Sequence, residues 1–176
     1  YDPGSGRPLW NAPCLTMATC GTAVWTNGIV IASGGYPDAG TAAVTADGSG
    51  RVLWNNRVKC YEQSMLAHDG YVYAMADTGV VYCWEARTGK EMWKTRLRGP
   101  VSASPLLVGD NIHVTNELGT TFVFRASPQA YQPISRNQLG NESFATTSVA
   151  DGVLYLRVAH RQRNRRQEVL YAVSEK

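Results

Sequence analysis

A tryptophan that recurs about every 40 residues constrains this chain more than any other feature. Trp10, Trp54 and Trp93 are separated by 44 and 39 residues. Each copy follows the same pattern: Ser or Thr, Gly, Arg or Lys, two further residues, then Trp. The glycines of the three copies are Gly6, Gly50 and Gly89. A repeat of this length indicates an architecture built from similar supersecondary units.

A second signal recurs every 41 or 42 residues, out of phase with the tryptophans. It is an Asp-Gly, Asn-Gly or Asp-Asn pair followed by apolar and β-branched residues, and its copies begin at Asn27, Asp69, Asp110 and Asp151. Such pairs favour tight hairpin turns. A further turn follows at Asp77-Thr78-Gly79 and at Glu117-Leu118-Gly119. One period therefore contains four short antiparallel strands, and no segment shows the periodicity of a long helix.

Four strands in about 41 residues are typical of one blade of a β-propeller. The sequence thus predicts an all-β protein: a propeller segment of about four four-stranded antiparallel blades, half of a seven- or eight-bladed ring. A β-sandwich is the alternative, which three independent repeating signals disfavour. We expect one domain over residues 1–176, with an outer strand at 1–10 and blades at about 11–54, 55–94, 95–134 and 135–176.

The first strand of each blade lies nearest the axis of a propeller. These strands are expected at residues 22–25, 64–67, 103–107 and 145–149. The loops before them should face the central opening, where propellers often bind ligands. The residues that mark these loops are Thr19, Gln63, Ser102 and Ser143.

The segment Tyr82-Cys83-Trp84-Glu85-Ala86-Arg87-Thr88-Gly89-Lys90-Glu91-Met92-Trp93 resembles the tryptophan-docking repeat of quinoprotein-like propellers, which carry repeats of the pyrroloquinoline-quinone type. The resemblance implies that Trp54 and Trp93 are largely buried between neighbouring blades, and that the Thr-Gly pair shapes the turn on which the indole rests. The third period has no Trp at this place, and Tyr131 is expected to fill part of the gap.

The resembled family contains two functional classes. Some members are periplasmic dehydrogenases that hold the quinone and a calcium ion on the propeller axis, above a pair of adjacent cysteines. Others are binding scaffolds, for example in outer-membrane protein assembly. The cysteines of this chain, Cys14, Cys20, Cys60 and Cys83, include no adjacent pair. The resemblance therefore implies a non-catalytic scaffold of the bacterial periplasm or cell envelope, without pyrroloquinoline quinone or calcium. A fragment of a quinoprotein dehydrogenase and a sensor domain of a larger protein are the alternatives.

Basic residues concentrate in one stretch. The formal net charge is +3, and five of the 17 Lys and Arg residues are Arg157, Arg161, Arg163, Arg165 and Arg166. The stretch separates two strand-like runs, which predicts a long charged hairpin tip. It is either a solvated loop or an anion-binding site for an acidic protein or a lipid headgroup. Nucleic acid is disfavoured, because no aromatic residue is interleaved to stack on bases.

Other candidate sites give weaker signals. Cys14 and Cys20 have a spacing compatible with a small disulfide loop, and buried free thiols are the alternative. The histidines His68, His113 and His160 fall in different blades and form no metal-ligand spacing. No catalytic or metal site is predicted, and no apolar run approaches the roughly 18 residues of a transmembrane helix.

The two ends of the repeat array are expected to be open. The fourth blade lacks its outermost strand, and the strand at residues 7–10 has no blade before it. Unpaired strand edges and an exposed blade face favour association. Three arrangements are open: the N-terminal strand closes the fourth blade within one chain, pairs with a second copy in an eight-bladed dimer, or belongs to a larger propeller. The last two are favoured, and we expect self-association through the open faces. A protein partner is also expected, which the sequence does not identify.

Overall fold

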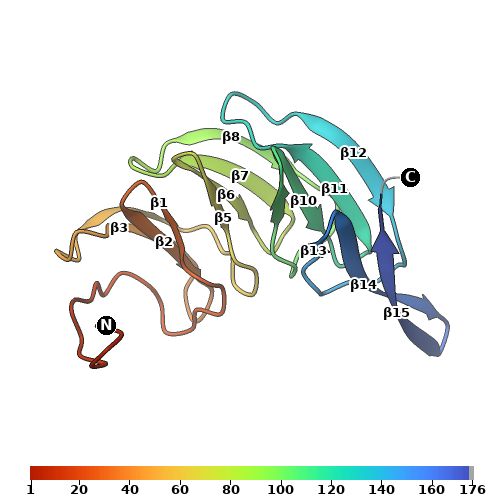
Figure 1. The fold of residues 1–176 in the computed structure, drawn as a ribbon, viewed down its shortest axis with the longest axis horizontal. Helices are drawn as coiled ribbons and strands as arrows, with labels where there is room; N and C mark the ends of the chain where they lie inside the picture. Colours follow the sequence, from red (N-terminus) through yellow and green to blue (C-terminus); the bar gives the residue numbers. More distant parts are fainter. Residues whose placement is uncertain (175–176) are drawn as a thin grey trace.

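A computed structural model describes residues 1–174, in which fifteen strands form four antiparallel sheets that stand side by side in an open arc (Figure 1). The first sheet contains β1 (Val24–Thr26), β2 (Ile29–Gly34), β3 (Gly40–Thr45) and β4 (Val52–Asn56). The second contains β5 (Leu66–His68), β6 (Tyr71–Met75), β7 (Val80–Glu85) and β8 (Glu91–Arg96). The third contains β9 (Leu106–Val108), β10 (Asn111–Thr115), β11 (Thr120–Arg125) and β12 (Pro133–Gln138). The fourth contains β13 (Ser148–Ala150), β14 (Val153–Gln162) and β15 (Arg165–Val173).

Each sheet is an up-and-down meander in which consecutive strands are hydrogen-bonded neighbours. The prediction of an all-β propeller segment is confirmed, and we call each sheet a blade. The first strand of each blade begins two or three residues later than the sequence predicted. Within residues 1–174 no helix is long and apolar enough to span a membrane.

The hairpin turns between the first two strands explain why Asn and Asp precede Gly there. Asn27, Asp69 and Asp151 have φ values of 47°, 48° and 49°, and each following glycine also has a positive φ. Such turns match the twist of the flanking strands. The third blade differs from the sequence alignment by one residue, because Val108 pairs with Asn111 and the turn is Gly109-Asp110.

Two apolar clusters fill the spaces between blades. Because side chains alternate across a strand, Val72 of β6 packs with Ile31 of the first blade, and its neighbour Tyr73 packs with Phe124 of the third. All four side chains are buried, and burying each stabilises the fold by about 1.5–3 kcal/mol. The blades therefore hold one another in place.

The expected outer strand at residues 7–10 does not form in the structure. Trp10 lies against Gly48 of the first blade instead. Asn11 contacts Gly50, and Ala18 forms an antiparallel bridge with Tyr36. The first blade is thus covered by the chain that precedes it. The fourth blade has three strands in the described residues.

Candidate binding face

The meander topology gives the protein two different faces. In each blade the turns after the first and third strands lie on one side, which we call the turn face. The turn after the second strand and the loops that join blades lie on the other side, which we call the loop face. The loops between blades comprise residues 57–65, 97–105 and 139–147.

A seam of backbone hydrogen bonds runs along the loop face and joins three blades. Each bond joins the turn after the second strand of a blade to one of the two loops that flank that blade. The bonds are Asp77 to Lys59 (3.1 Å), Val101 to Asp77 (3.1 Å), Glu117 to Pro100 (2.9 Å) and Ser143 to Glu117 (3.0 Å). The loops of this face are therefore tied together across the blades.

Side chains strengthen the seam and explain two of the residues that the sequence placed at the central opening. Gln63 is buried and donates to the carbonyl oxygen of Met75 and to Oδ1 of Asp77. Ser102 Oγ donates to Oε1 of Glu117 at 2.7 Å. Both residues therefore anchor turns of the loop face.

A ladder of hydroxyl groups lies just before the innermost strands instead. Thr22 N–H donates to Ser64 Oγ (2.9 Å), Ser64 N–H to Ser104 Oγ (2.9 Å), and Ser104 N–H to Thr146 Oγ1 (3.0 Å). In the sequence the ladder corresponds to a hydroxyl residue that recurs every 40 to 42 residues. Three of these hydroxyls already accept backbone N–H groups, and among the described residues no cluster of three metal-ligating side chains exists.

Large apolar side chains stand exposed on the loop face. Leu118 is on the β10–β11 turn, Tyr36 is on the β2–β3 turn, and Phe144 and Met17 are on loops that lead into a blade. All four are more than half exposed. Leu118 rests on Gly99, where a Cβ would lie 2.9 Å from Leu118 Cδ1. These exposed apolar side chains therefore stand at separate places along the loop face, on segments that hydrogen bonds tie to their neighbours.

The hairpin of β14 and β15 is longer than its counterparts and projects from the last blade (Figure 1). In the second blade Met75 pairs with Val81 across a short turn. At the equivalent place Arg157 pairs with Leu170, so that an extra length of paired strand extends past the blade. Arg163 begins its two-residue turn with a φ of 50°.

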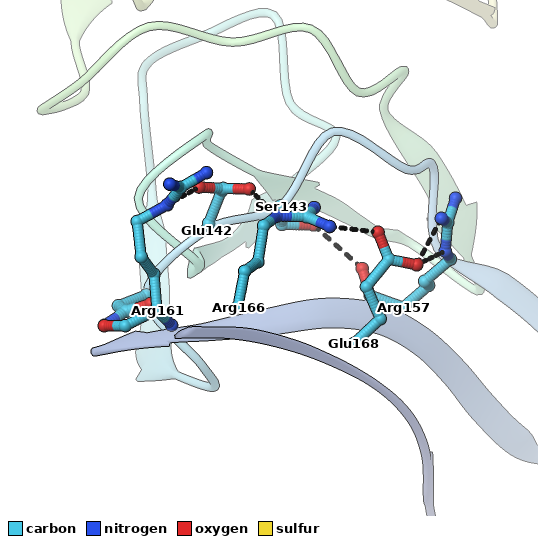
Figure 2. A network of polar contacts seen from close by, with 7 residues as sticks. Glu142, Ser143, Arg157, Arg161, Arg166 and Glu168 are labelled. Atoms are coloured by element: carbon cyan, nitrogen blue, oxygen red, sulfur yellow. Dashed lines mark hydrogen bonds and ion pairs between the residues drawn. The ribbon is translucent and has the colours of Figure 1, made fainter. Parts of the chain in front are cut away.

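A network of ion pairs covers one side of this hairpin (Figure 2). The carboxylate of Glu142 accepts from Arg161 Nε at 2.7 Å and from Arg166 Nε. Glu168 accepts from Arg166 at 2.5 Å and from Arg157 Nε at 2.7 Å. Hydrogen bonds from Arg161 and then Arg166 lower the pKa of Glu142, and those from Arg166 and then Arg157 lower the pKa of Glu168.

The loop before the fourth blade buttresses the hairpin through its backbone. Asn141 donates its side-chain amide to the Arg161 carbonyl (2.8 Å) and accepts from the Arg161 N–H (2.7 Å). Ala159 N–H donates to the carbonyl of Glu142 at 2.7 Å, and Ser143 Oγ donates to the Arg157 carbonyl at 3.1 Å. The hairpin is thus fixed to the loop face.

The five arginines that the sequence singled out therefore have two environments. Arg157, Arg161 and Arg166 are held in ion pairs, whereas Arg163 and Arg165 form none within residues 1–174. The sequence could not assign Glu142 to this site, because it lies on the preceding loop.

The docking tryptophans Trp54 and Trp93 lie between blades, packed against the apolar clusters and largely buried, as the sequence predicted. Trp54 Nε1 donates to the carbonyl of Ala86 in the next blade at 2.8 Å, and its indole lies on Gly89. Trp93 Nε1 donates to the carbonyl of Ser127 at 2.8 Å. Tyr131 packs against Trp93, with ring centres 5.8 Å apart. Tyr131 therefore packs against the tryptophan of the second blade. It does not take the place of the tryptophan that is absent from its own repeat.

The first copy of the tryptophan repeat is less embedded. Trp10 is exposed and lies against Gly48 of the first blade, where a Cβ would be 4.0 Å from the indole. Gly6 has a φ of 69° and no neighbour within 4 Å of a Cβ position. Position 50, by contrast, requires glycine, because a Cβ there would lie 2.5 Å from the Asn11 carbonyl oxygen.

All four cysteines are free thiols, so the disulfide proposed for Cys14 and Cys20 is not formed. The segment between them is held to Tyr36 through Thr16 and Ala18, and the two thiols are directed to different neighbours. Cys14 lines a hollow beside Asn55 and Arg57, whereas Cys20 lies against Tyr61.

The buried thiols and the histidines serve the packing of the fold. Burial raises the pKa values of the Cys60 and Cys83 thiols to about 12. His160 shares a hydrogen bond of 2.9 Å with the Tyr171 hydroxyl, and burial lowers the pKa of His113. The histidines lie in three different blades: His68 in β5, His113 in β10 and His160 in β14.

Comparison with known proteins identifies the family. The sequence model of a family described as outer membrane protein assembly factor BamB matches residues 1–152. The serine/threonine-protein kinase AfsK of Streptomyces griseus is 31% identical over 127 residues, which are 64% of this chain and 15% of that protein. BamB of Legionella pneumophila is 26% identical over 109 residues, 61% of this chain and 28% of that protein. The chain thus spans less than a third of either curated relative.

Solved structures show the same fold at lower identity. BamB of Moraxella catarrhalis superposes with a TM-score of 0.63 at 20% identity, over 78% of this chain and 40% of that chain. The quinohemoprotein alcohol dehydrogenase of Comamonas testosteroni gives 0.66 at 14%, over 85% and 30%. The computationally designed Ika4 protein gives 0.70 at 13%, over 96% and 99%. With the family match over most of its length, the chain belongs to the BamB-like family of β-propellers built from pyrroloquinoline-quinone-type repeats.

Proposed function

We propose that this chain is a non-catalytic binding module of the bacterial cell envelope that holds a protein partner on its loop face. The observation that supports this is the set of exposed apolar side chains there, Leu118 and Phe144 among them, on loops tied together by the backbone seam. Binding surfaces are commonly loops positioned by a rigid scaffold. The similarity to proteins named as outer membrane assembly factors supports the location.

Site-directed photo-crosslinking tests this function. A photoreactive amino acid replaces Leu118 or Phe144 on the loop face, or Arg87 or Asp110 on the turn face, in cells that produce the full chain. We expect both loop-face positions to yield an adduct with the same protein, and the turn-face positions to yield none. Equal labelling from both faces, or no adduct from the loop face, would contradict the proposal.

The competing enzyme function calls for a different result. A dehydrogenase fragment would be stabilised by its cofactors, because a ligand that binds only the folded state raises its stability. We propose that pyrroloquinoline quinone with calcium leaves the melting temperature unchanged. A concentration-dependent rise would favour the enzyme.

A sensor domain is the second candidate, and the 31% identity to the kinase AfsK favours it. In this function the loop face binds a signal instead of an assembly partner. Fusion of the chain to a kinase domain tests this directly. Loop-face substitutions such as Leu118→Ser would then change kinase activity, whereas a pure scaffold would leave it unaltered.

We also propose that the chain self-associates through its fourth blade. Leu170 and Tyr155 are exposed there on the face that, in the other blades, is covered by a neighbour. Light scattering at tens of micromolar should show a dimer, and Leu170→Lys should shift it toward the monomer. A monomer at all concentrations would refute this proposal.

A further inference from the structure

The projecting hairpin is a feature that the family repeat does not explain. The family match ends at residue 152, and β14 begins at Val153. The extension of β14 and β15 past the blade also has no counterpart in the other three blades, whose second and third strands are five or six residues long. Any role of this segment therefore depends on its own side chains.

The hairpin and its buttress carry an excess of positive charge. Five arginines face two glutamates, and each glutamate already binds two guanidinium groups. Arg163 and Arg165 at the tip have no ion pair within residues 1–174. Such a surface attracts anions and favours their association.

The glutamates hold the arginines in position for a ligand. A guanidinium has five N–H donors, and Arg161 uses only its Nε in the network. Because Glu142 and the Asn141 clamp already order the segment, an incoming carboxylate would not have to immobilise it. The network therefore presents preorganised donors rather than flexible charges.

An exposed aromatic side chain adjoins these donors. Phe144 is more than half exposed and lines a hollow of about 110 Å³ together with Arg157, Arg166 and Glu168. A ligand that combines a carboxylate with an aliphatic side chain would use both features. Acidic polypeptide segments have this chemistry, with planar carboxylates that bind guanidinium groups through two parallel hydrogen bonds.

Other anionic partners fit the hairpin less well. Membrane recognition by charge alone needs about four to eight basic residues, and here two of the five arginines remain outside ion pairs. The turn Arg163-Asn164 also carries no apolar side chain to enter a bilayer. We infer that the tip of the β14–β15 hairpin, with Phe144, docks an acidic, leucine-containing segment of a partner protein. This inference rests on the proposed function and names the partner's chemistry.

Fluorescence anisotropy with defined peptides tests the inference. The probe is a fluorescein-labelled peptide of alternating Glu and Leu, and its control has Gln in place of Glu. The test variant is Arg163→Glu with Arg165→Glu. The matched control, Arg87→Glu with Lys90→Glu, makes the same charge change at exposed positions on the turn face.

We expect the acidic peptide to bind the wild type and the control equally, and the hairpin variant at least tenfold more weakly. The Gln peptide should bind weakly to all three. Equal loss in both variants, or equal binding of both peptides, overturns the inference. Vesicles containing phosphatidylglycerol are a second probe, and binding of vesicles without binding of the acidic peptide would assign the hairpin to membranes instead.

These experiments distinguish an error in the partner's chemistry from an error in the proposed binding function. If the hairpin variant binds the acidic peptide as the wild type does, while Leu118 and Phe144 still crosslink one protein, only the partner's chemistry is wrong. If the crosslinks are also missing, the loop face is not the binding surface. Identical melting temperatures of the two variants would show that the substitutions leave the fold intact.

Discussion

The side chain of Asn141 both donates to and accepts from the backbone of Arg161, at 2.8 and 2.7 Å. These two hydrogen bonds fix the loop at residues 139–147 to β14, the second strand of the fourth blade. Asn141→Ala should therefore loosen the projecting hairpin at a cost of about 1 kcal/mol. Hydrogen exchange at the Arg161 amide should accelerate. Asn137→Ala, on the exposed strand β12, is the control that should leave this amide unchanged.

A docking tryptophan should contribute more to stability than an exposed tryptophan. Trp93→Ala removes a largely buried indole and its hydrogen bond to Ser127, which should lower the free energy of unfolding by about 3 kcal/mol. Trp25 is exposed on the inner strand β1, and Trp25→Ala should stay within about 0.5 kcal/mol. Denaturant unfolding measures both, and equal effects would refute the docking role.

Thiol chemistry should follow burial. Iodoacetamide should modify the exposed Cys20 first in the folded protein. Cys60 and Cys83, whose pKa values burial raises to about 12, should react only after unfolding. Mass spectrometry after timed labelling gives the order. If Cys20 and Cys14 react only after reduction, a disulfide joins them in the purified protein.

Lowering the pH should break the ion pairs of the hairpin by protonating Glu142 and Glu168. Hydrogen bonds from arginines lower the pKa values of Glu142 and Glu168 below the ordinary 4.5. A lowered pKa means that the stabilisation is complete above about pH 4.5 and is lost as the pH falls through the lowered values. Carboxyl-carbon NMR titration should give midpoints below 4.5 for both groups. Midpoints at or above 4.5 would mean that the network does not persist in solution.

The sequence predicted the blades because their signals are local. The Asp69-Gly70 turn and the repeat around Trp93 each lie within a dozen residues, and the spacing of such signals counts the blades. The strand expected at residues 7–10 does not form. A strand needs a neighbouring strand to pair with, and a local sequence pattern does not show whether one is present.

The candidate site was only partly predictable. The arginine stretch was visible, but Glu142 lies 19 and 24 residues from Arg161 and Arg166, and nothing in the sequence pairs them. The hydroxyl ladder, with Ser64 and Ser104 in neighbouring blades, joins residues about 40 apart. Its period was present in the sequence, but single hydroxyl residues are too common to reveal it without the fold.

Hydrogen–deuterium exchange of the protein with and without the acidic peptide tests the central claim most directly. The account predicts slower exchange in residues 139–147 and 159–168, where the loop and the hairpin present their arginines and Phe144. The turn-face residues 27–28, 69–70 and 109–110 should be unchanged. Protection confined to the turn face, or no protection at saturating peptide, would contradict a binding site on the loop face.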